Sequence, residues 1–383
     1  MDFAWSEEQQ AFRREVVRFA QQELADDLIA RDLKEEFSWD AWNKCARFGI
    51  HGLPIPQEYG GGGADVLTTV GALDALGYGC RDNGLIFSIN AHMWSAEIPV
   101  LAFGTEAQKR KYLPKLVSGE FVGIHAMTEP MSGSDAFSLR TRAVRKGNCY
   151  VLNGSKTFIS NAPVAAMVIV FANLDPAMSP AGVTAFIVDK GTPGLSISKK
   201  LHKMGLRTSP MAELSLEDCE IPAENLLGKE GGGQVVFTVS MEWERICIMA
   251  AKLGAMQRLL ETCIKYARER QQFGKSIGTF PAIANKIAQM DMRLEASRLL
   301  LYRAAWLKSQ GRHPLREASI AKLFIAEAYV QTALDAIQIH GGYGYMTEYQ
   351  IERELRDAVS GKIYSGTSEI QERIIASFNG VRE

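Results

Sequence analysis

Two positions far apart in the chain carry side chains whose types bear on proton transfer. Glu244 is a carboxylate within a long helical pattern, and Ser365 is a hydroxyl in the short run from Lys362 to Ser368. A hydroxyl cannot take a proton at neutral pH without an activating base of its own, whereas a carboxylate can act as a general base. Glu244 could therefore act as a base, whereas Ser365 could not do so alone.

A second carboxylate, Glu242, lies two residues before Glu244. Two residues correspond to about 200° around a helix, so the two side chains cannot share a face. Only one of them can point toward a given site. The alternative for Glu244 is an exposed helical carboxylate paired with a nearby Arg or Lys, which is the usual condition of such a residue.

The composition is that of an ordinary globular protein. The 383 residues are 46% hydrophobic and 23% charged, with a net charge of -1. This balance argues against binding of nucleic acid or of an anionic membrane surface. The chain has no secretory-signal pattern and no run apolar enough to span a bilayer. Its 6 cysteines and 6 histidines are scattered, so we expect a cytoplasmic protein with reduced thiols and no metal site.

The hydrophobic pattern predicts an α+β fold that is mostly α, in three domains. Residues 1–120 have helical periodicity, residues 121–227 contain short β-rich runs, and residues 228–383 are helical again. The middle domain is expected to be a β-barrel or sandwich with a hairpin turn at Asn153-Gly154. The last domain is expected to be an antiparallel bundle of four long helices, at 235–267, 283–307, 318–339 and 349–358.

Five motifs occur in order along the chain. They are the runs His125 to Asp135, Lys156 to Asn161, Arg270 to Lys275, Gln338 to Gly342 and Tyr364 to Thr367. Together they resemble the acyl-CoA dehydrogenase flavoprotein family, and the resemblance covers essentially the whole chain. It implies FAD as cofactor, a helical N-terminal domain, a β-domain, a C-terminal four-helix domain, and assembly as a homotetramer.

The resemblance assigns residues to the cofactor. Those expected to line the flavin are His125, Met127, Thr128, Ser134, Phe158 and Ser160, the last close to N5. Those expected to reach the FAD of a neighbouring subunit are Arg270, Gln272, Phe273, Gln338, Gly341 and Gly342. Thr367 and Glu369 would lie by the adenosine half. An Arg suits a pyrophosphate because its planar fork donates two hydrogen bonds, and glycines allow close backbone approach.

One departure from the family pattern concerns the adenine side. Pro281 follows Phe280 where many relatives have Gln. A contact to the adenine is therefore either missing or made by other atoms.

The family reaction removes the α-proton of an acyl thioester while the β-hydride passes to flavin N5. Most members carry the catalytic Glu at the position of Ser365. The isovaleryl and long-chain branches keep a Glu on a helix of the C-terminal domain instead, and it aligns with Glu244. The resemblance therefore implies Glu244 as the base. Ser134, Arg245, Tyr364 and Ser365 would contact the substrate, with Arg245 holding local geometry or the thioester arm.

The runs around Gly77 to His92, Trp243-Glu244 and Tyr364 to Gly366 most resemble one branch of the family. Its members oxidise acyl or prolyl groups tethered to carrier proteins in natural-product pathways. A carrier-protein enzyme would need a basic docking rim. Four residues could supply it, or could simply be solvated helix surface: Lys109, Arg110, Lys111 and Lys115.

Other functions stay open at this stage. One alternative is a dehydrogenase of free short or branched acyl-CoA. The same fold also hosts flavin oxidases and monooxygenases, or could serve as a non-catalytic FAD scaffold. The resemblance suggests an electron-transfer flavoprotein or oxygen as the electron acceptor.

Overall fold

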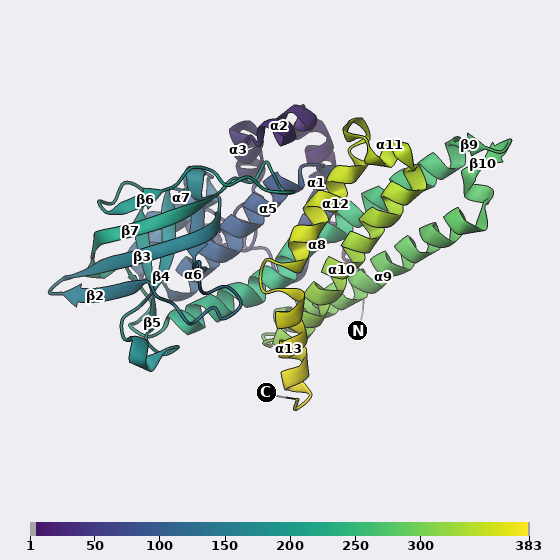
Figure 1. Ribbon diagram of the computed structural model, residues 1–383. Helices are drawn as coiled ribbons and strands as arrows, with labels where there is room; N and C mark the ends of the chain where they lie inside the picture. The colour runs from purple at the N-terminus through teal and green to yellow at the C-terminus, as the bar shows by residue number, and fades with distance from the viewer. Residues whose placement is uncertain (1–4, 382–383) are drawn as a thin grey trace.

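The computed structural model describes residues 5–381 and shows a central sheet flanked by helices (Figure 1). Most of the chain before the sheet is helical, in agreement with the sequence pattern. The helices are α1 (Glu7–Glu23), α2 (Leu28–Lys34), α3 (Trp39–Phe48), α4 (Val66–Gly79), α5 (Asn83–His92), α6 (Ile98–Phe103) and α7 (Glu106–Val117). A π-helical turn, Met93–Glu97, joins α5 to α6.

The central strands form one eight-stranded sheet with the order β6-β7-β3-β2-β4-β5-β8, and β1 pairs with β4. Their bounds are β1 (Gly123–Ala126), β2 (Arg142–Lys146), β3 (Cys149–Ser160), β4 (Met167–Asn173), β5 (Val183–Asp189), β6 (Leu195–Ile197), β7 (Met211–Pro222) and β8 (Leu226–Leu227). Strand β4 is buried on both faces. Val168 and Val170 belong to a hydrophobic core formed by residues of the strands. Ile169 and Phe171 belong to the larger core that includes the helices.

The predicted hairpin turn at Asn153-Gly154 is wrong. Both residues lie inside β3, and the turn that joins β2 to β3 is at Gly147-Asn148, between the paired residues Lys146 and Cys149. Gly154 is needed for a different reason. A Cβ there would lie 2.4 Å from Thr141 Oγ1, so the glycine permits a close approach at an irregularity of the strand.

The C-terminal part contains the four helices that the sequence predicts; the first three extend beyond the predicted bounds at both ends, whereas the fourth begins later than predicted, at Ile351, and is only 9 residues long. The elements are α8 (Gly233–Glu269), β9 (Gln271–Gln272), β10 (Lys275–Ser276), α9 (Pro281–Ser309), α10 (Leu315–His340), α11 (Gly342–Tyr345), α12 (Ile351–Val359) and α13 (Ser368–Phe378). Figure 1 shows α8 running from the sheet to the far tip formed by β9 and β10. We propose the divisions 1–120, 121–227 and 228–383 as domains, because the type of element changes near both boundaries.

Two glycines bring α4 and α8 into backbone contact. A Cβ at Gly77 would lie 2.0 Å from the carbonyl oxygen of Ala251, and a Cβ at Gly254 would lie 2.1 Å from that of Asp74. No other residue type fits such a crossing without moving the helices apart. This contact fixes the N-terminal helices against the helix that carries Glu244.

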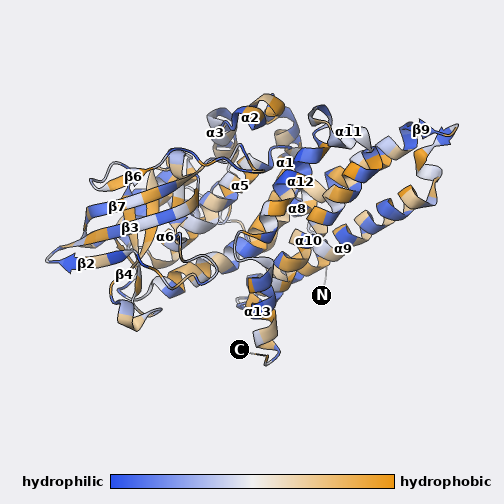
Figure 2. Ribbon diagram, viewed as in Figure 1, coloured by the Kyte–Doolittle hydropathy of each residue, from blue (hydrophilic) through white to orange (hydrophobic). Residues whose placement is uncertain are grey.

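A buried polar network joins the N-terminal helices, the loop between β6 and β7, and the C-terminal helices. Helix α12 is largely hydrophilic in Figure 2, yet Glu354 and Asp357 on it are buried. Arg258 Nη2 on α8 donates to Glu354 Oε1 at 2.9 Å, Asn83 Nδ2 on α5 donates to Glu354 Oε2 at 3.1 Å, and the Leu206 amide donates to Asp357 Oδ1 at 2.6 Å. Burial alone would raise the pKa of Glu354, but Arg258, Arg353 and the hydroxyl of Tyr329 hold it at about 2.

No helix within residues 5–381 is both long and apolar enough to cross a membrane.

Candidate active site

Glu244 and Ser365 meet in the fold. Glu244 on α8 is only 8% exposed, and the hydroxyl of Ser365 donates a hydrogen bond to its Oε1. Ser365 has a φ of 56° and the following Gly366 a φ of 93°. Left-handed backbone at two consecutive positions forms a sharp turn that aims the Ser365 hydroxyl at the carboxylate.

Three side chains from three helices hold this turn, which we call the Ser365 turn (residues 364–367). Arg245 Nε on α8 donates to the carbonyl of Ser365 at 3.0 Å. Lys322 Nζ on α10 donates to the carbonyl of Gly366 at 2.6 Å. Gln371 Nε2 on α13 donates to both carbonyls, at 3.1 and 2.9 Å. The turn is therefore built as a fixed part of the site.

The carboxylate of Glu244 is buried without being neutralised. Burial raises the pKa of Glu244, while the Ser365 hydroxyl and the charges of Arg245 and Lys322 oppose the rise. Among the described residues no cation lies within ion-pair distance of the carboxylate, because Arg245 and Lys322 direct their hydrogen bonds to backbone carbonyls. A buried carboxylate with a raised pKa and a free oxygen is suited to general-base catalysis.

Glu242 lies on a different side of α8, as the helical angle requires. Its carboxylate pairs with Lys308 Nζ at 2.5 Å and lies 3.4 Å from His313 Nδ1. Glu242 is therefore a partner in an ion pair, and Glu244 is the carboxylate that faces the Ser365 turn.

Aromatic side chains directly precede both members of the pair in the chain: Trp243 precedes Glu244, and Tyr364 precedes Ser365. Tyr364 packs on Phe87 of α5 with ring centroids 5.0 Å apart, and Trp243 stacks on Trp94 with centroids 5.7 Å apart. Burial, reinforced by the nearby Glu244 carboxylate, raises the pKa of the Tyr364 phenol, which stays neutral. The Tyr364–Phe87 pair therefore places apolar surface beside Glu244 and limits access of water.

The two segments predicted to line the flavin lie side by side. The Thr157 amide donates to the carbonyl of Thr128 at 3.0 Å, and Lys156 Nζ donates to the carbonyl of Met127 at 3.1 Å. Phe158, next in the chain, has a φ of 57° and is 64% exposed. An exposed aromatic ring beside this ordered backbone offers a planar apolar surface for a ligand.

The flavin-lining segments also connect to Glu244 through α5. Asn161, which follows Ser160, donates from Nδ2 to the carbonyl of Ser88 at 2.9 Å. Its neighbour Phe87 packs on Tyr364, directly before Ser365. The strand end, α5 and the Ser365 turn are therefore adjacent.

His125 and Ser134 occupy the remaining predicted flavin positions. His125 is half-buried against Phe171 and Phe237, and burial lowers its pKa to about 4, so the imidazole is neutral. Within the described residues its Nδ1 is buried without a hydrogen-bond partner. Ser134 is exposed in the loop beyond β1.

The third and fourth motifs lie elsewhere in the chain. Arg270 stacks over the ring of Tyr343 at 5.5 Å, which brings the run from Arg270 to Phe273 beside Gly341 and Gly342. Every member of this group is exposed, including Gln272 and Gln338, and Phe273 is 93% exposed. Since Arg270 follows Glu244 by 26 residues along α8, about 39 Å separates them. One chain does not bring both groups to one place.

The other predicted positions flank these groups. Thr367 is the N-cap of α13 and accepts from the Ile370 amide at 3.4 Å, and Glu369 is exposed in the first turn of that helix. Pro281 is the first residue of α9, where its ring fits because the amide there needs no helical acceptor.

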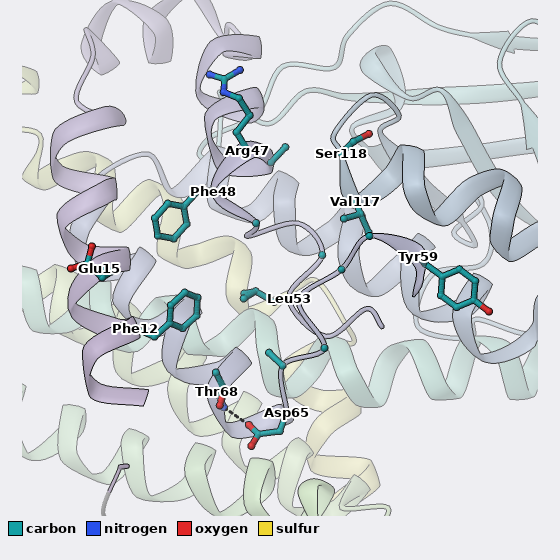
Figure 3. Close-up of a pocket in the computed structure, with 18 of the residues that line it drawn as sticks. Phe12, Glu15, Arg47, Phe48, Leu53, Tyr59, Asp65, Thr68, Val117 and Ser118 are labelled. Atoms are coloured by element: carbon teal, nitrogen blue, oxygen red, sulfur yellow. Dashed lines mark hydrogen bonds between the residues drawn. The ribbon is translucent and has the colours of Figure 1, made fainter. Parts of the chain in front are cut away.

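A groove of about 1390 Å³ lies apart from Glu244, among α1, α3, the Gly60 to Gly63 loop and the end of α7 (Figure 3). Phe12, Phe48 and Leu53 give it apolar walls, with Glu15 and Asp65 at its edges. None of the predicted site residues lines this groove. The Glu244 cluster, rather than the groove, therefore defines the candidate active site.

Sequence reasoning missed three parts of the site: Lys322, Gln371 and the aromatic residue Phe87. Lys322 is fully buried among Ala318, Ala321 and Ile325. A lysine on the apolar face of a predicted helix was a detectable signal, because such a cation is rarely buried unless it has a partner. The contact of Phe87 with Tyr364 joins distant segments, and the contacts of Gln371 reach carbonyls only five and six residues earlier; neither carried a sequence signal.

The predicted basic rim is largely paired within the chain. Arg110 bonds Glu106 at 2.7 Å, Lys111 bonds Asp189 at 3.0 Å and Lys115 bonds Glu120 at 3.2 Å. Surface pairs of this kind remain available to a partner but are not free charges. Within residues 5–381 no cluster of His, Cys, Asp and Glu could hold a metal ion.

The chain belongs to the acyl-CoA dehydrogenase family. Family models for the N-terminal, middle and C-terminal domains of acyl-CoA dehydrogenases match residues 6–120, 125–219 and 231–378. The motifs, the helix–sheet–helix order and the buried carboxylate all agree with this membership.

Individual relatives are similar over the whole chain. The crystal structure of the prolyl acyl carrier protein oxidase AnaB is 53% identical, covers 99% of this chain and 100% of its own, and has a TM-score of 0.98. PigA with FAD and proline is 40% identical over 100% of both chains, with a TM-score of 0.98. An acyl-CoA dehydrogenase of Bacillus subtilis is 43% identical over 97% of this chain and 98% of its own.

The environment of Glu244 predicts how stability responds to its removal. Because its pKa is raised above the ordinary value of 4.5, ionisation of Glu244 opposes folding, so the chain loses stability as pH rises through the folded pKa. We expect Glu244→Gln to unfold at a higher temperature than the parent at about pH 8, and the difference to vanish below about pH 4. Thermal unfolding across this range measures it.

Glu242→Gln is the matched control. It breaks the ion pair with Lys308 and should lower the unfolding temperature at neutral pH. A Glu244→Gln protein that is less stable than the parent at neutral pH would contradict the assignment of a strained, buried carboxylate.

Proposed function

We propose that this protein catalyses FAD-dependent α,β-dehydrogenation of an acyl thioester, with Glu244 as the base. The observation that carries the proposal is the position of Glu244, buried, unneutralised and beside a turn that adjoins the flavin-lining strand end. A carboxylate buried only for stability would be expected to have a cationic partner, as Glu242 has in Lys308.

The chain's own residues supply binding and proton transfer. The exposed ring of Phe158 and the backbone near Thr128 fit a planar flavin, and the unpartnered Nδ1 of His125 is free for a hydrogen bond to it. The chemistry that bound FAD would supply is an acceptor for the hydride of the β-carbon. Glu244 takes the α-proton on the carboxylate oxygen that Ser365 leaves free, while Tyr364, packed on Phe87, limits access of water.

The proposed substrate is an acyl or prolyl group carried as a thioester on a carrier protein. The 53% identity to AnaB, a prolyl acyl carrier protein oxidase, supports this, as does the likeness to PigA with FAD and proline. The second candidate is a free short or branched acyl-CoA, favoured by the 43% identity to an acyl-CoA dehydrogenase. We propose an electron-transfer flavoprotein or oxygen as acceptor.

We also propose a homo-oligomer, with a tetramer as the expected state. The Arg270 group lies about 39 Å along α8 from Glu244, so a second copy must supply it if both groups hold one FAD. The exposed apolar side chains Phe273, Tyr345 and Met346 at this tip fit burial against that copy. A cytoplasmic location is supported by six free cysteines, five of them buried.

Removal of the base should stop the chemistry and leave the cofactor in place. We expect Glu244→Gln to retain FAD but to lose anaerobic flavin bleaching by an acyl thioester by about 100-fold or more, because the α-proton then has no acceptor. Stopped-flow absorbance of the flavin measures the rate. Glu242→Gln should bleach at nearly the parent rate. Normal bleaching by Glu244→Gln would remove Glu244 from the mechanism.

The same assay ranks the candidate substrates. A prolyl thioester on a carrier protein should bleach the flavin at least about tenfold more efficiently than prolyl-CoA, prolyl-pantetheine or butyryl-CoA. Greater efficiency with a CoA thioester would favour the second candidate. Bleaching that needs dioxygen would indicate a monooxygenase, and no bleaching with any thioester would leave a flavin-binding scaffold.

The oligomer proposal predicts a remote effect on cofactor binding. Arg270→Ala should weaken FAD binding by about tenfold or more, since a charge-assisted hydrogen bond to a pyrophosphate is lost, although the residue is far from Glu244 in its own chain. The nearby exposed Arg268→Ala is the control. Fluorescence titration of FAD and sedimentation velocity are the measurements. A monomeric parent protein that binds FAD fully would refute the shared site.

A further inference from the structure

We infer that Lys322 is a positioning residue for the reaction: its ammonium fixes the Gly366 carbonyl and thereby keeps the Ser365 hydroxyl against the Glu244 carboxylate. This inference rests on the proposed function, because it takes Glu244 as the base. It assigns a role to a side chain that contacts neither the predicted flavin surface nor the carboxylate directly.

The placement of Lys322 is costly for stability alone. The side chain is fully buried on α10, with Ala318 and Ile325 on the same face. Its ammonium donates a hydrogen bond of 2.6 Å to the backbone carbonyl of Gly366 and not to a carboxylate. A buried ammonium that donates to a single uncharged acceptor stabilises the fold less than an apolar side chain of the same size would. What it does provide is a fixed position for the acceptor.

The Ser365 turn needs such an anchor. Ser365 is in the left-handed region, with a φ of 56°, which residues with a Cβ seldom occupy. Arg245 and Gln371 hold the Ser365 carbonyl, and Lys322 and Gln371 hold that of Gly366. Without Lys322 the Gly366 carbonyl would accept a hydrogen bond from Gln371 alone. The backbone of the turn could then relax out of the left-handed region.

Relaxation of the turn acts on the base through the hydroxyl. Ser365 donates to Oε1 of Glu244, which stabilises the ionised carboxylate and fixes its orientation, with Oε2 left for the proton. Loss of that hydrogen bond raises the pKa of Glu244 and lets the carboxylate rotate. Lys322 therefore affects proton abstraction indirectly: it binds the Gly366 carbonyl, and the adjacent Ser365 binds Glu244.

The titration of Lys322 sets an alkaline limit to the pH range in which proton abstraction is fast. Charged groups from three helices act on Lys322: Glu244 and Arg245 of α8, Glu327 of α10, and Glu369 of α13. Burial, together with the adjacent Arg245, lowers the pKa of Lys322 to about 8. Above that pH the neutral amine is a weaker donor to Gly366 and no longer favours ionised Glu244. The rate of proton abstraction should fall on this limb.

The test compares Lys322→Met with Lys322→Arg in the FAD-loaded protein. For Lys322→Met we expect slower anaerobic bleaching by about tenfold, an acid limb moved to higher pH, and loss of the alkaline limb near pH 8. Lys322→Arg keeps the charge, so it should restore part of the rate and move the alkaline limb upward by about one pH unit or more. FAD content and unfolding temperature are recorded for each protein.

Lys252→Met is the matched control for the loss of a buried lysine. Lys252 lies on α8, is 4% exposed and faces the ring of Tyr329, away from the Ser365 turn. It should leave the rate and the pH profile of bleaching unchanged. The double variant Lys322→Met with Ser365→Ala should be no slower than the slower single variant, since both act through one hydrogen bond.

Three results would overturn the inference: a parent-like rate and pH profile for Lys322→Met, additive effects in the double variant, or an alkaline limb that Lys322→Arg leaves in place. The last measurement remains decisive if Lys322→Met fails to fold. Failure of the proposed function is a separate result, since it would show as normal bleaching by Glu244→Gln. A dead Glu244→Gln with a parent-like Lys322→Met would refute the role of Lys322 alone.

Discussion

A carboxylate that is buried yet not neutralised is the constraint around which this site is organised. Glu354 shows the ordinary outcome, since Arg258 pairs with it and its pKa is held at about 2. Glu244 has cations close by, but Arg245 and Lys322 donate to backbone carbonyls, and its pKa is raised. The two cations therefore fix the Ser365 turn and do not form an ion pair with Glu244. Proton abstraction requires a carboxylate that is left unpaired in this way.

This arrangement depends on the long helix α8 and on its close crossing with α4. Helix α8 carries Glu244 on its buried side, and Gly254 lets α4 approach to backbone contact. Helix α5 follows α4 directly, so Phe87 is placed against Tyr364 and the carbonyl of Ser88 against Asn161. The distance between the strand end and the carboxylate is thus set by packed helices, which hold a reactive geometry better than loops do.

The sequence predicted the type and order of the elements, because periodicity is a local property, and it separated Glu244 from Glu242 by helical angle alone. It failed where a residue serves a distant contact. Gly154 has a turn signature, but the approach of Thr141 places it inside β3. The role of Lys322 depends on a carbonyl 44 residues away, and only the fold brings them together.

The same reasoning explains why a hydroxyl suits position 365. A carboxylate there would lie against Glu244, and two carboxylates in one apolar site cannot both be ionised, so one would hold a proton and oppose the other. Serine instead provides a donor that favours the ionised form of Glu244. Placing the base on α8 and placing a short donor in the turn are therefore one coupled change. The left-handed backbone of Ser365 is part of that change, since in this conformation so short a side chain reaches the carboxylate.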